Sequence, residues 1–206
     1  MLENIQHFFS EYQPKALHVK REYAVLIPII MVKGFPHILY EVRSQHISQP
    51  GDTSFPGGKV ELGESYQEAA VRETIEELQI PGESIQVIGE MDYIVQNNSI
   101  IHSFIGEIKG IDIKDIVWNE EVAEVYTVPL RYFMKNEPDY YSVDMMMNYP
   151  KDFPYDRIPN GKNYKFRHAR NQIAFYNLDD HYLWGFTASL TQRLISLVKE
   201  HHLLDN

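Results

Sequence analysis

Apolar residues in this chain form short runs whose spacing predicts β-strands. The run at 23–32 is rich in Val and Ile, and a second run at 38–43 follows the turn Lys33-Gly34, so we expect the two runs to form a β-hairpin. The same criteria predict further strands at 85–96, 100–108, 122–128, 173–177 and 182–184. The stretch 130–165 shows no regular spacing, and we expect irregular structure there.

Apolar positions at helical spacing predict three helices, at 1–15, 65–79 and 187–201. The second is the clearest, because Ser65 and Glu68 form a capping box and Pro81-Gly82 is expected to stop the helix. Strands, one helix, further strands and a last helix predict an α/β (α+β) fold with a mixed sheet and helices on its faces.

Length and composition fit one domain. The chain has 206 residues, of which 44% are hydrophobic, enough to fill a single core. We expect a helical segment within 1–20 and one domain at 21–206, in which the late strands and the last helix form a C-terminal extension. Cysteine is absent, which excludes disulfides and zinc–thiolate sites.

Charge and hydropathy restrict the partners of the chain. The formal net charge of -10 disfavours nonspecific binding to nucleic acid. The N-terminus lacks the basic start of a secretory signal, and the apolar run at 23–32, broken by Pro28, is too short to cross a bilayer. We therefore expect no nucleic-acid partner, no membrane association and a cytoplasmic location. A phosphate substrate would need a local positive charge, which a divalent metal cluster would supply.

The helix at 65–79 carries three glutamates on one side. With Glu73 at zero on a helical wheel, Glu77 lies about 40° to one side and Glu76 about 60° to the other. The opposite side is apolar and consists of Val71, Ile75 and Leu78. The wheel therefore predicts a carboxylate face turned outward and an apolar face turned inward. A solvated acidic surface has the same pattern, so the three glutamates alone do not decide between that surface and a metal site.

The surroundings of this helix favour the metal site. Gly57-Gly58 precedes the helix and allows close approach of the backbone, so a carbonyl there could join a metal shell. Arg72 stands beside Glu73 and can hold a carboxylate in fixed orientation through a bidentate contact, with Glu64 as its expected partner or as an outer ligand. Oxygen ligands of this kind suit Mg²⁺ or Mn²⁺.

The same segment resembles the signature of the Nudix hydrolase family. That signature is G, five residues, E, seven residues and R-E-U-x-E-E-x-G-U, where U is bulky and aliphatic. Here Gly58, Glu64 and the stretch 72–80, Arg-Glu-Thr-Ile-Glu-Glu-Leu-Gln-Ile, match it with every charged position intact. Thr74 replaces an aliphatic residue, and Gln79 replaces the glycine that normally ends the helix, so Pro81-Gly82 is expected to end it one turn later.

This resemblance implies a Nudix-type α/β/α sandwich and a pyrophosphatase that uses Mg²⁺ or Mn²⁺. The implied metal ligands are Gly57 through its carbonyl, Glu73, Glu76, Glu77 and Glu121. The implied catalytic residues are Glu64, Arg72, Glu76 and Glu121. Glu121 lies in the stretch 119–125, which resembles the loop that often supplies a late acid in the family, and Glu124 is the alternative.

A second resemblance concerns the substrate. The residues from 38 to 58 are similar to the pattern L-L-x-x-R-S, a loop with Gly, and F-P-G-G that precedes the Nudix signature in coenzyme A pyrophosphatases. Trp184-Gly185-Phe186-Thr187-Ala188 resembles a late W-G-x-T-A element of this subfamily. The loop is one residue short, and Ser48 lies near the place of an expected basic residue. The implied substrate-binding residues are Arg43, Ser44, Phe55 and Gly58.

Three alternatives stay open from the sequence. The substrate could be ADP-ribose or another nucleoside diphosphate derivative, because the signature binds only the diphosphate and the metals. The chain could also be a Nudix-fold module that senses a nucleotide without cleaving it, although such modules usually lose charged positions. A basic cluster at Lys162, Lys165, Arg167, His168 and Arg170 could meet a substrate phosphate or belong to a solvated loop. A homodimer is one possible assembly.

Overall fold

The computed structural model describes residues 2–96, 98–167 and 169–203. The helices are α1 (Leu2–Glu11), α2 (Tyr66–Leu78), α3 (Leu130–Lys135) and α4 (Gly185–Glu200). The main sheet contains β1 (Arg21–Val32), β2 (Phe35–Arg43), β3 (Thr53–Ser54), β4 (Gly57–Lys59), β5 (Ile85–Glu90), β6 (Ile94–Gln96), β7 (Ser99–Ile108) and β8 (Val122–Pro129). A second sheet contains β9 (Asp139–Met145), β10 (Ala169–Asn177) and β11 (Tyr182–Trp184).

The main sheet is mixed, as the sequence predicts. Its central path runs β3-β2-β1-β7-β5, with β4 on β1, β6 on β7 and β8 on β2. Within the described residues, β1 and β7 pair in parallel and the other pairs of this sheet are antiparallel. The predicted hairpin of β1 and β2 is confirmed, with Val32 opposite Phe35 at its turn.

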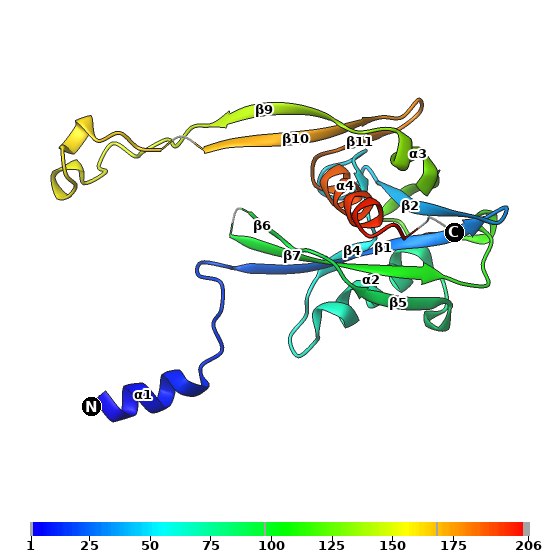
Figure 1. Ribbon diagram of the computed structural model, residues 1–206, viewed down its shortest axis with the longest axis horizontal. Coiled ribbons are helices and arrows are strands. Elements are labelled where there is room, and N and C mark those ends of the chain that lie inside the picture. Colours follow the sequence, from blue (N-terminus) through cyan, green and yellow to red (C-terminus); the bar gives the residue numbers. More distant parts are fainter. Residues whose placement is uncertain (1, 97, 168, 204–206) are drawn as a thin grey trace.

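Helices cover both faces of this sheet, which confirms the α/β/α arrangement (Figure 1). Alternation along β1 directs Leu26 towards α2, where it packs with Ala69 and Ala70, and directs Ile27 into the core that contains Ile195 of α4. The residues of β2 divide in the same way between the two faces. Every second side chain of these strands therefore faces α2, the helix that carries the acidic signature.

Two expected segments differ from the structure. Residues 130–165 are not wholly irregular, because they contain α3 and β9. β9 pairs with the distant β10, and its alternating Tyr141, Val143 and Met145 form a signal only three residues long. The predicted strand 85–96 is divided into β5 and β6. The register shifts between Val87 and Gly89, and the chain leaves β5 at Met91, a buried residue whose N–H donates to the Ser103 carbonyl.

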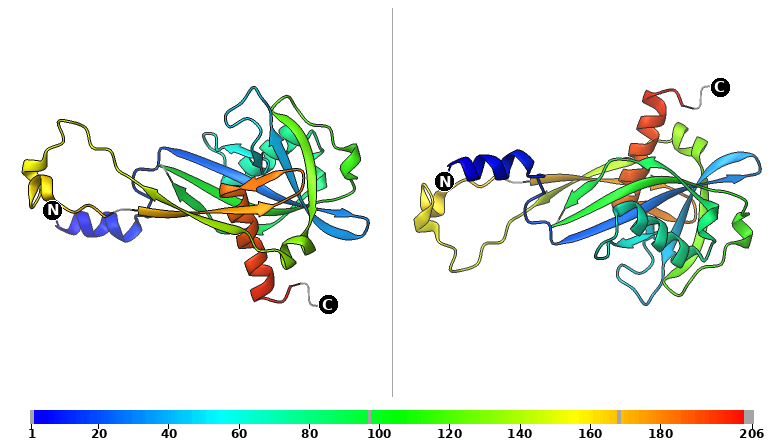
Figure 2. Two further views of the ribbon diagram at one scale, coloured as in Figure 1. Left: turned by 90° about the horizontal axis from the view of Figure 1, so that it is seen from above. Right: turned by 90° about the horizontal axis from the view of Figure 1, so that it is seen from below.

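Two elements project from the body on the same side, α1 and the arm formed by β9 and β10 (Figures 1 and 2). The outer end of the arm carries two short 3₁₀ turns, Tyr155–Arg157 and Gly161–Asn163. No residue of α1 is buried. Within the parts of the chain that the structure describes, no helix is long and apolar enough to cross a membrane.

Candidate active site

The helix α2 begins as the sequence predicts and ends earlier. The Glu68 N–H donates to Ser65 Oγ at 3.2 Å and the Ser65 N–H donates to Glu68 Oε2 at 2.8 Å, which confirms the capping box. The helix ends at Leu78 because Gln79 itself adopts the left-handed conformation, with φ of +49°. The expectation that Pro81-Gly82 ends the helix one turn later is therefore wrong.

Arg72 organises the solvent side of the site. Its Nε and Nη2 donate to the two carboxylate oxygens of Glu64 at 2.8 and 3.2 Å, and its Nη1 donates to Glu73 Oε1 at 2.8 Å. Glu76 Oε2 lies 3.5 Å from Nη1. The contact of Arg72 with Glu64 confirms the predicted pair. These hydrogen bonds lower the pKa of Glu64, which therefore stays ionised and holds the guanidinium in place.

The Gly57-Gly58 loop passes so close to its neighbours that a side chain would not fit. A Cβ on Gly57 would lie 2.4 Å from the Ala24 carbonyl oxygen, and a Cβ on Gly58 would lie 2.3 Å from Glu73 Oε1. The Gly57 N–H donates to Glu77 Oε2 at 2.8 Å. This loop therefore positions Glu77 directly and lies in close contact with Glu73.

The prediction that all three glutamates of α2 face solvent is confirmed for Glu76, which is exposed, and is wrong for Glu77. Glu77 is only 4% exposed and Glu73 is half-buried, whereas Val71 and Ile75 are partly exposed. Thr74, at the position of an aliphatic residue in the family signature, is fully buried and donates to the carbonyl one turn earlier at 2.7 Å. A wheel shows which residues share a side, but the tertiary packing of the helix decides which side meets the sheet.

A further acid, Glu41 on β2, joins this group and was not singled out from the sequence. It is 2% exposed, and its Oε1 accepts a hydrogen bond from Ser54 Oγ at 2.9 Å. Burial raises the pKa of Glu41 to about 7, and the negative charges of Glu121 and Glu73 add to the rise. Burial, followed by the charge of Glu41, raises the pKa of Glu77 to about 9. The signal available in the sequence was a charged residue inside an otherwise apolar strand.

The loop before β8 brings Glu121 to the same group. This loop is fixed to the end of α2, because the Asn119 N–H donates to the Glu77 carbonyl at 2.9 Å. The charge of Glu121 contributes to the raised pKa of Glu77. Glu124 lies elsewhere and contacts His181 at 3.2 Å. The geometry therefore supports Glu121 over Glu124 as the acid from this loop.

Of the residues predicted to bind substrate, Arg43, Ser44 and Gly58 lie beside the acids, whereas Phe55 lies in the core. The β2–β8 pairing has an irregularity after Val42, and there the Ser44 N–H donates to the Glu121 carbonyl at 2.8 Å. The guanidinium of Arg43 donates from Nε to the Ser48 carbonyl at 2.7 Å. Phe55 is buried and stacks on a core tyrosine, so it supports the loop by packing. The substrate contacts of these residues stay predictions.

The donor set of the acidic group suits a divalent cation. The group offers carboxylate and carbonyl oxygens, which Mg²⁺ and Mn²⁺ prefer, and Glu41 Oε2 is buried with no hydrogen-bond partner among the described residues. Among the described residues, no three acidic or histidine side chains converge closely enough to hold an ion. One oxygen of Glu77 accepts from the Gly57 N–H and one oxygen of Glu73 accepts from Arg72, which leaves the second oxygen of each carboxylate for a cation.

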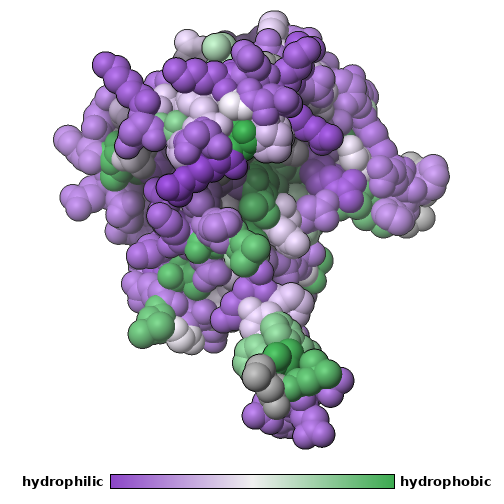
Figure 3. Space-filling model, turned by 90° about the vertical axis from the view of Figure 1, so that its left-hand side faces the viewer, coloured by the Kyte–Doolittle hydropathy of each residue, from purple (hydrophilic) through white to green (hydrophobic). Residues whose placement is uncertain are grey.

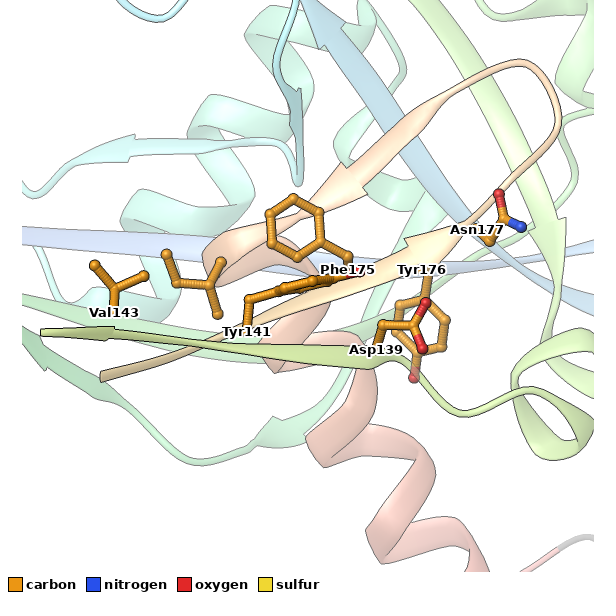
Figure 4. Close-up of a pocket in the computed structure, with 7 residues that line it drawn as sticks. Asp139, Tyr141, Val143, Phe175, Tyr176 and Asn177 are labelled. Atoms are coloured by element: carbon orange, nitrogen blue, oxygen red, sulfur yellow. The ribbon is translucent and has the colours of Figure 1, made fainter. Parts of the chain in front are cut away.

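Two open cavities differ in their relation to the grouped acids. One, of about 680 Å³, lies along the outer side of α2 and is lined in part by Glu64, Arg72 and Glu76. The other, of about 480 Å³, lies on the face of β9 and β10, where Tyr141 and Phe175 point into it (Figure 4). Because this second cavity contains none of the grouped acids, it does not belong to the candidate active site.

The basic cluster belongs to the outer part of the β9–β10 arm. Figure 1 places the segment between β9 and β10 at the end of the arm that lies away from α2. Arg170 donates to Asp144 Oδ1 across the two strands at 2.9 Å, and His168 lies outside the described residues. The cluster therefore does not line the acidic group of its own chain.

Comparison with known proteins identifies the family signature independently. The model of the NUDIX domain matches residues 20–144, more than half of the chain. Curated relatives include Nudix hydrolase 3 of Caenorhabditis elegans, 26% identical over 180 residues, which cover 85% of this chain and 72% of the relative. Another is the human mitochondrial coenzyme A diphosphatase NUDT8, 28% identical over 181 residues, with 85% and 68% covered.

A third relative and one solved structure extend the similarity to nearly the whole chain. NudL of Salmonella newport is 26% identical over 201 residues, which cover 92% of both chains. The crystal structure of a MutT/nudix family protein from Enterococcus faecalis aligns with a TM-score of 0.52 at 13% identity, covering 97% of this chain and 70% of the other. At this identity the structural similarity shows the fold alone.

Proposed function

Because the chain belongs to the Nudix hydrolase family, whose members generally use divalent metal ions and hydrolyse phosphoric anhydride bonds, we propose that it cleaves the diphosphate of coenzyme A or its derivatives. Water adds to one phosphorus and the bridging P–O bond breaks. The products are 4'-phosphopantetheine and adenosine 3',5'-bisphosphate, so both phosphates of the bridge leave as monoesters.

One observation carries this choice of substrate. The coenzyme A-type pattern has two halves, Arg43-Ser44 and Phe55–Gly58, which are separated by a loop in the sequence. Both halves lie next to the acids in the structure. The Ser44 N–H donates to the Glu121 carbonyl, and the Gly57 N–H donates to the Glu77 carboxylate. Similarity to a protein named as a coenzyme A diphosphatase supports the same choice.

We assign the following roles to the side chains. Glu73, Glu76, Glu77 and Glu121, with the Gly57 carbonyl, would hold Mg²⁺ or Mn²⁺, which supplies polarised phosphate oxygens and activated water when bound. Glu64 orients Arg72, which in turn holds Glu73. Glu76 has a 55% exposed side chain and Glu121 is exposed, so both are accessible to water and are the candidates for the base.

Arg43 is the proposed phosphate contact. Its guanidinium lies at the end of β2 and donates to the carbonyl and hydroxyl of Ser48, at 2.7 and 3.2 Å. Neutral partners of this kind are readily exchanged for phosphate oxygens, which form stronger charge-assisted hydrogen bonds with a guanidinium.

A product assay tests the proposed function. Purified protein with Mg²⁺ or Mn²⁺ is given coenzyme A, ADP-ribose, NADH and diadenosine polyphosphates in parallel, and the products are resolved by chromatography. We expect coenzyme A to be cleaved with the highest kcat/KM and to release adenosine 3',5'-bisphosphate. Faster cleavage of another substrate would assign the same chemistry to that compound and reject coenzyme A.

We also propose that the partner of the chain is a second copy of itself. The apolar residues of α1 share one face of the helix and are all exposed: Leu2, Ile5, Phe8, Phe9 and Tyr12. The arm and the adjoining β11 present a second exposed apolar face, with Tyr141, Val143, Met145, Phe175 and Trp184. Figure 3 shows the hydrophobic surface of the projecting helix standing apart from the body. In water, both faces would gain from being covered.

Length and charge match these two elements to each other. The ten residues of α1 span about 15 Å, and the arm from Tyr141 to Met145 spans about 13 Å. The polar side of α1 carries Glu3 and Glu11 and no basic residue. The segment 146–170 at the end of the arm has six basic and two acidic residues, a net charge of +4 in a chain of -10. A twofold dimer would form the contact between α1 and the arm twice.

Light scattering coupled to size-exclusion chromatography tests the dimer. We expect the native chain to elute with twice its mass of 24.2 kDa, and the double variant Ile5→Asp/Phe8→Asp to bind its partner at least about 30-fold more weakly and elute as a folded monomer. His7→Asp, on the opposite side of α1, is the control and should remain dimeric. A native monomer at all concentrations, or a double variant that dimerises normally, would contradict the proposal.

A further inference from the structure

The position of Glu41 follows from the alternation of β2. Tyr40 faces the core that contains Ile195 of α4, whereas Leu39 faces the opposite side and packs with Leu78 of α2. Glu41 is on the same face of the strand as Leu39. The sheet therefore places this carboxylate beneath α2, on the side where Glu77 is buried.

The carboxylate of Glu41 is held at one oxygen and open at the other. Ser54 Oγ donates to Oε1 at 2.9 Å, while Oε2 is buried and has no hydrogen-bond partner in the part of the chain that the structure describes. Buried polar atoms without partners are rare, because such an atom loses its hydration without compensation. A side chain whose role was only to fill this space would be apolar.

The charged groups that face Glu41 do not neutralise it. Three are carboxylates from α2 and from the loop before β8, namely Glu73, Glu77 and Glu121. The fourth is Arg43 on its own strand, whose guanidinium is hydrogen-bonded to Ser48. Four carboxylates face one guanidinium, so full ionisation would leave an excess of negative charge around the buried Glu41. In the metal-free chain protons can offset this charge, and a divalent cation can take their place.

We infer that Glu41 is a member of the cation site, contributed by the sheet opposite the acids of α2, and that its Oε2 faces the bound ion. This inference rests on the proposed use of a divalent cation and adds an acid that lies outside the family signature. Ser54 is then the positioning residue, since its hydroxyl fixes Oε1 and directs Oε2 towards the other carboxylates. The added carboxylate raises the affinity for the ion, because more negative oxygens face it.

The test is the binding of Mn²⁺ in the absence of substrate, measured by calorimetry on the full chain. Glu41→Gln has the same size and keeps an acceptor for Ser54. We expect it to bind Mn²⁺ at least about tenfold more weakly than the native chain, while its metal-free form melts at the same or a higher temperature. Ser54→Ala leaves the carboxylate in place and should weaken Mn²⁺ binding by a smaller factor.

Glu124→Gln is the matched control, because Glu124 is a nearby acid that contacts His181 instead of the acidic group. It should bind Mn²⁺ with native affinity. Native affinity in Glu41→Gln, or a lower melting temperature of its metal-free form without a change in Mn²⁺ binding, would overturn the inference and assign Glu41 a structural role. Because no substrate is present, failure to cleave coenzyme A would reject the proposed substrate without affecting this result.

Discussion

Replacing Glu77 by Gln is expected to lower kcat/KM by about 10³-fold, the equivalent of about 4 kcal/mol of transition-state stabilisation. The carboxylate is 4% exposed, accepts from the Gly57 N–H at 2.8 Å and is surrounded by other acids. Gln can keep the hydrogen bond from Gly57, but it cannot supply the negative charge that a divalent cation needs. The measurement is steady-state hydrolysis of the best substrate in excess Mg²⁺.

Two further observations separate loss of the site from loss of the fold. Metal-free Glu77→Gln should unfold at the same or a higher temperature than the native chain, because a neutral amide is buried at lower cost than a carboxylate among other carboxylates. Glu107→Gln, at a partly exposed acid of β7 that pairs with Lys109, should keep native activity. If Glu77→Gln hydrolyses the substrate as fast as the native chain, Glu77 is not a cation ligand.

The sequence predicted the parts of the fold that depend on local pattern. The hairpin of β1 and β2, the capping box of α2 and the Arg72–Glu64 pair all rest on residues close together in the chain, and all three are confirmed. The sandwich of helices about a mixed sheet followed from the order of the elements. The prediction of irregular structure at 130–165 failed because β9 is stabilised by pairing with β10, a partner more than twenty residues away.

For the site too, the features that depend on residues close in sequence were predicted, and those that depend on distant residues were not. Spacing within α2 grouped Glu73, Glu76 and Glu77, and it gave the right exposure for Glu76 but not for Glu77, which is buried and accepts a hydrogen bond from the Gly57 N–H. Glu41 was missed because its importance comes from its neighbours in space. Only the register of β2 and the approach of α2 bring it under the other acids. The left-handed Gln79 was unexpected because a non-glycine residue rarely adopts that conformation.

The metal-free chain is expected to lose stability as the pH rises from about 5 to about 9. Burial raises the pKa of Glu77 to about 9 and that of Glu41 to about 7, from an ordinary value of 4.5. Between 4.5 and these values the folded chain binds more protons than the unfolded chain, so the free energy of unfolding falls with pH, by about 1.4 kcal/mol per unit for each proton. His37, whose pKa is lowered by burial and by Arg131, opposes this trend only below about 6.5.

Thermal unfolding in a chelator and in saturating Mg²⁺, at several pH values, checks this expectation. A bound cation takes the place of the protons on the buried acids, so the metal-loaded chain should lose less stability with rising pH, and the difference between the two melting temperatures should grow. Glu77→Gln removes one of the titrating groups, and its metal-free curve should be flatter than that of the native chain. Metal-free stability that stays constant or rises over this range would show that the buried acids are paired with positive groups in the folded chain. That result would contradict the proposal that a cation binds among them.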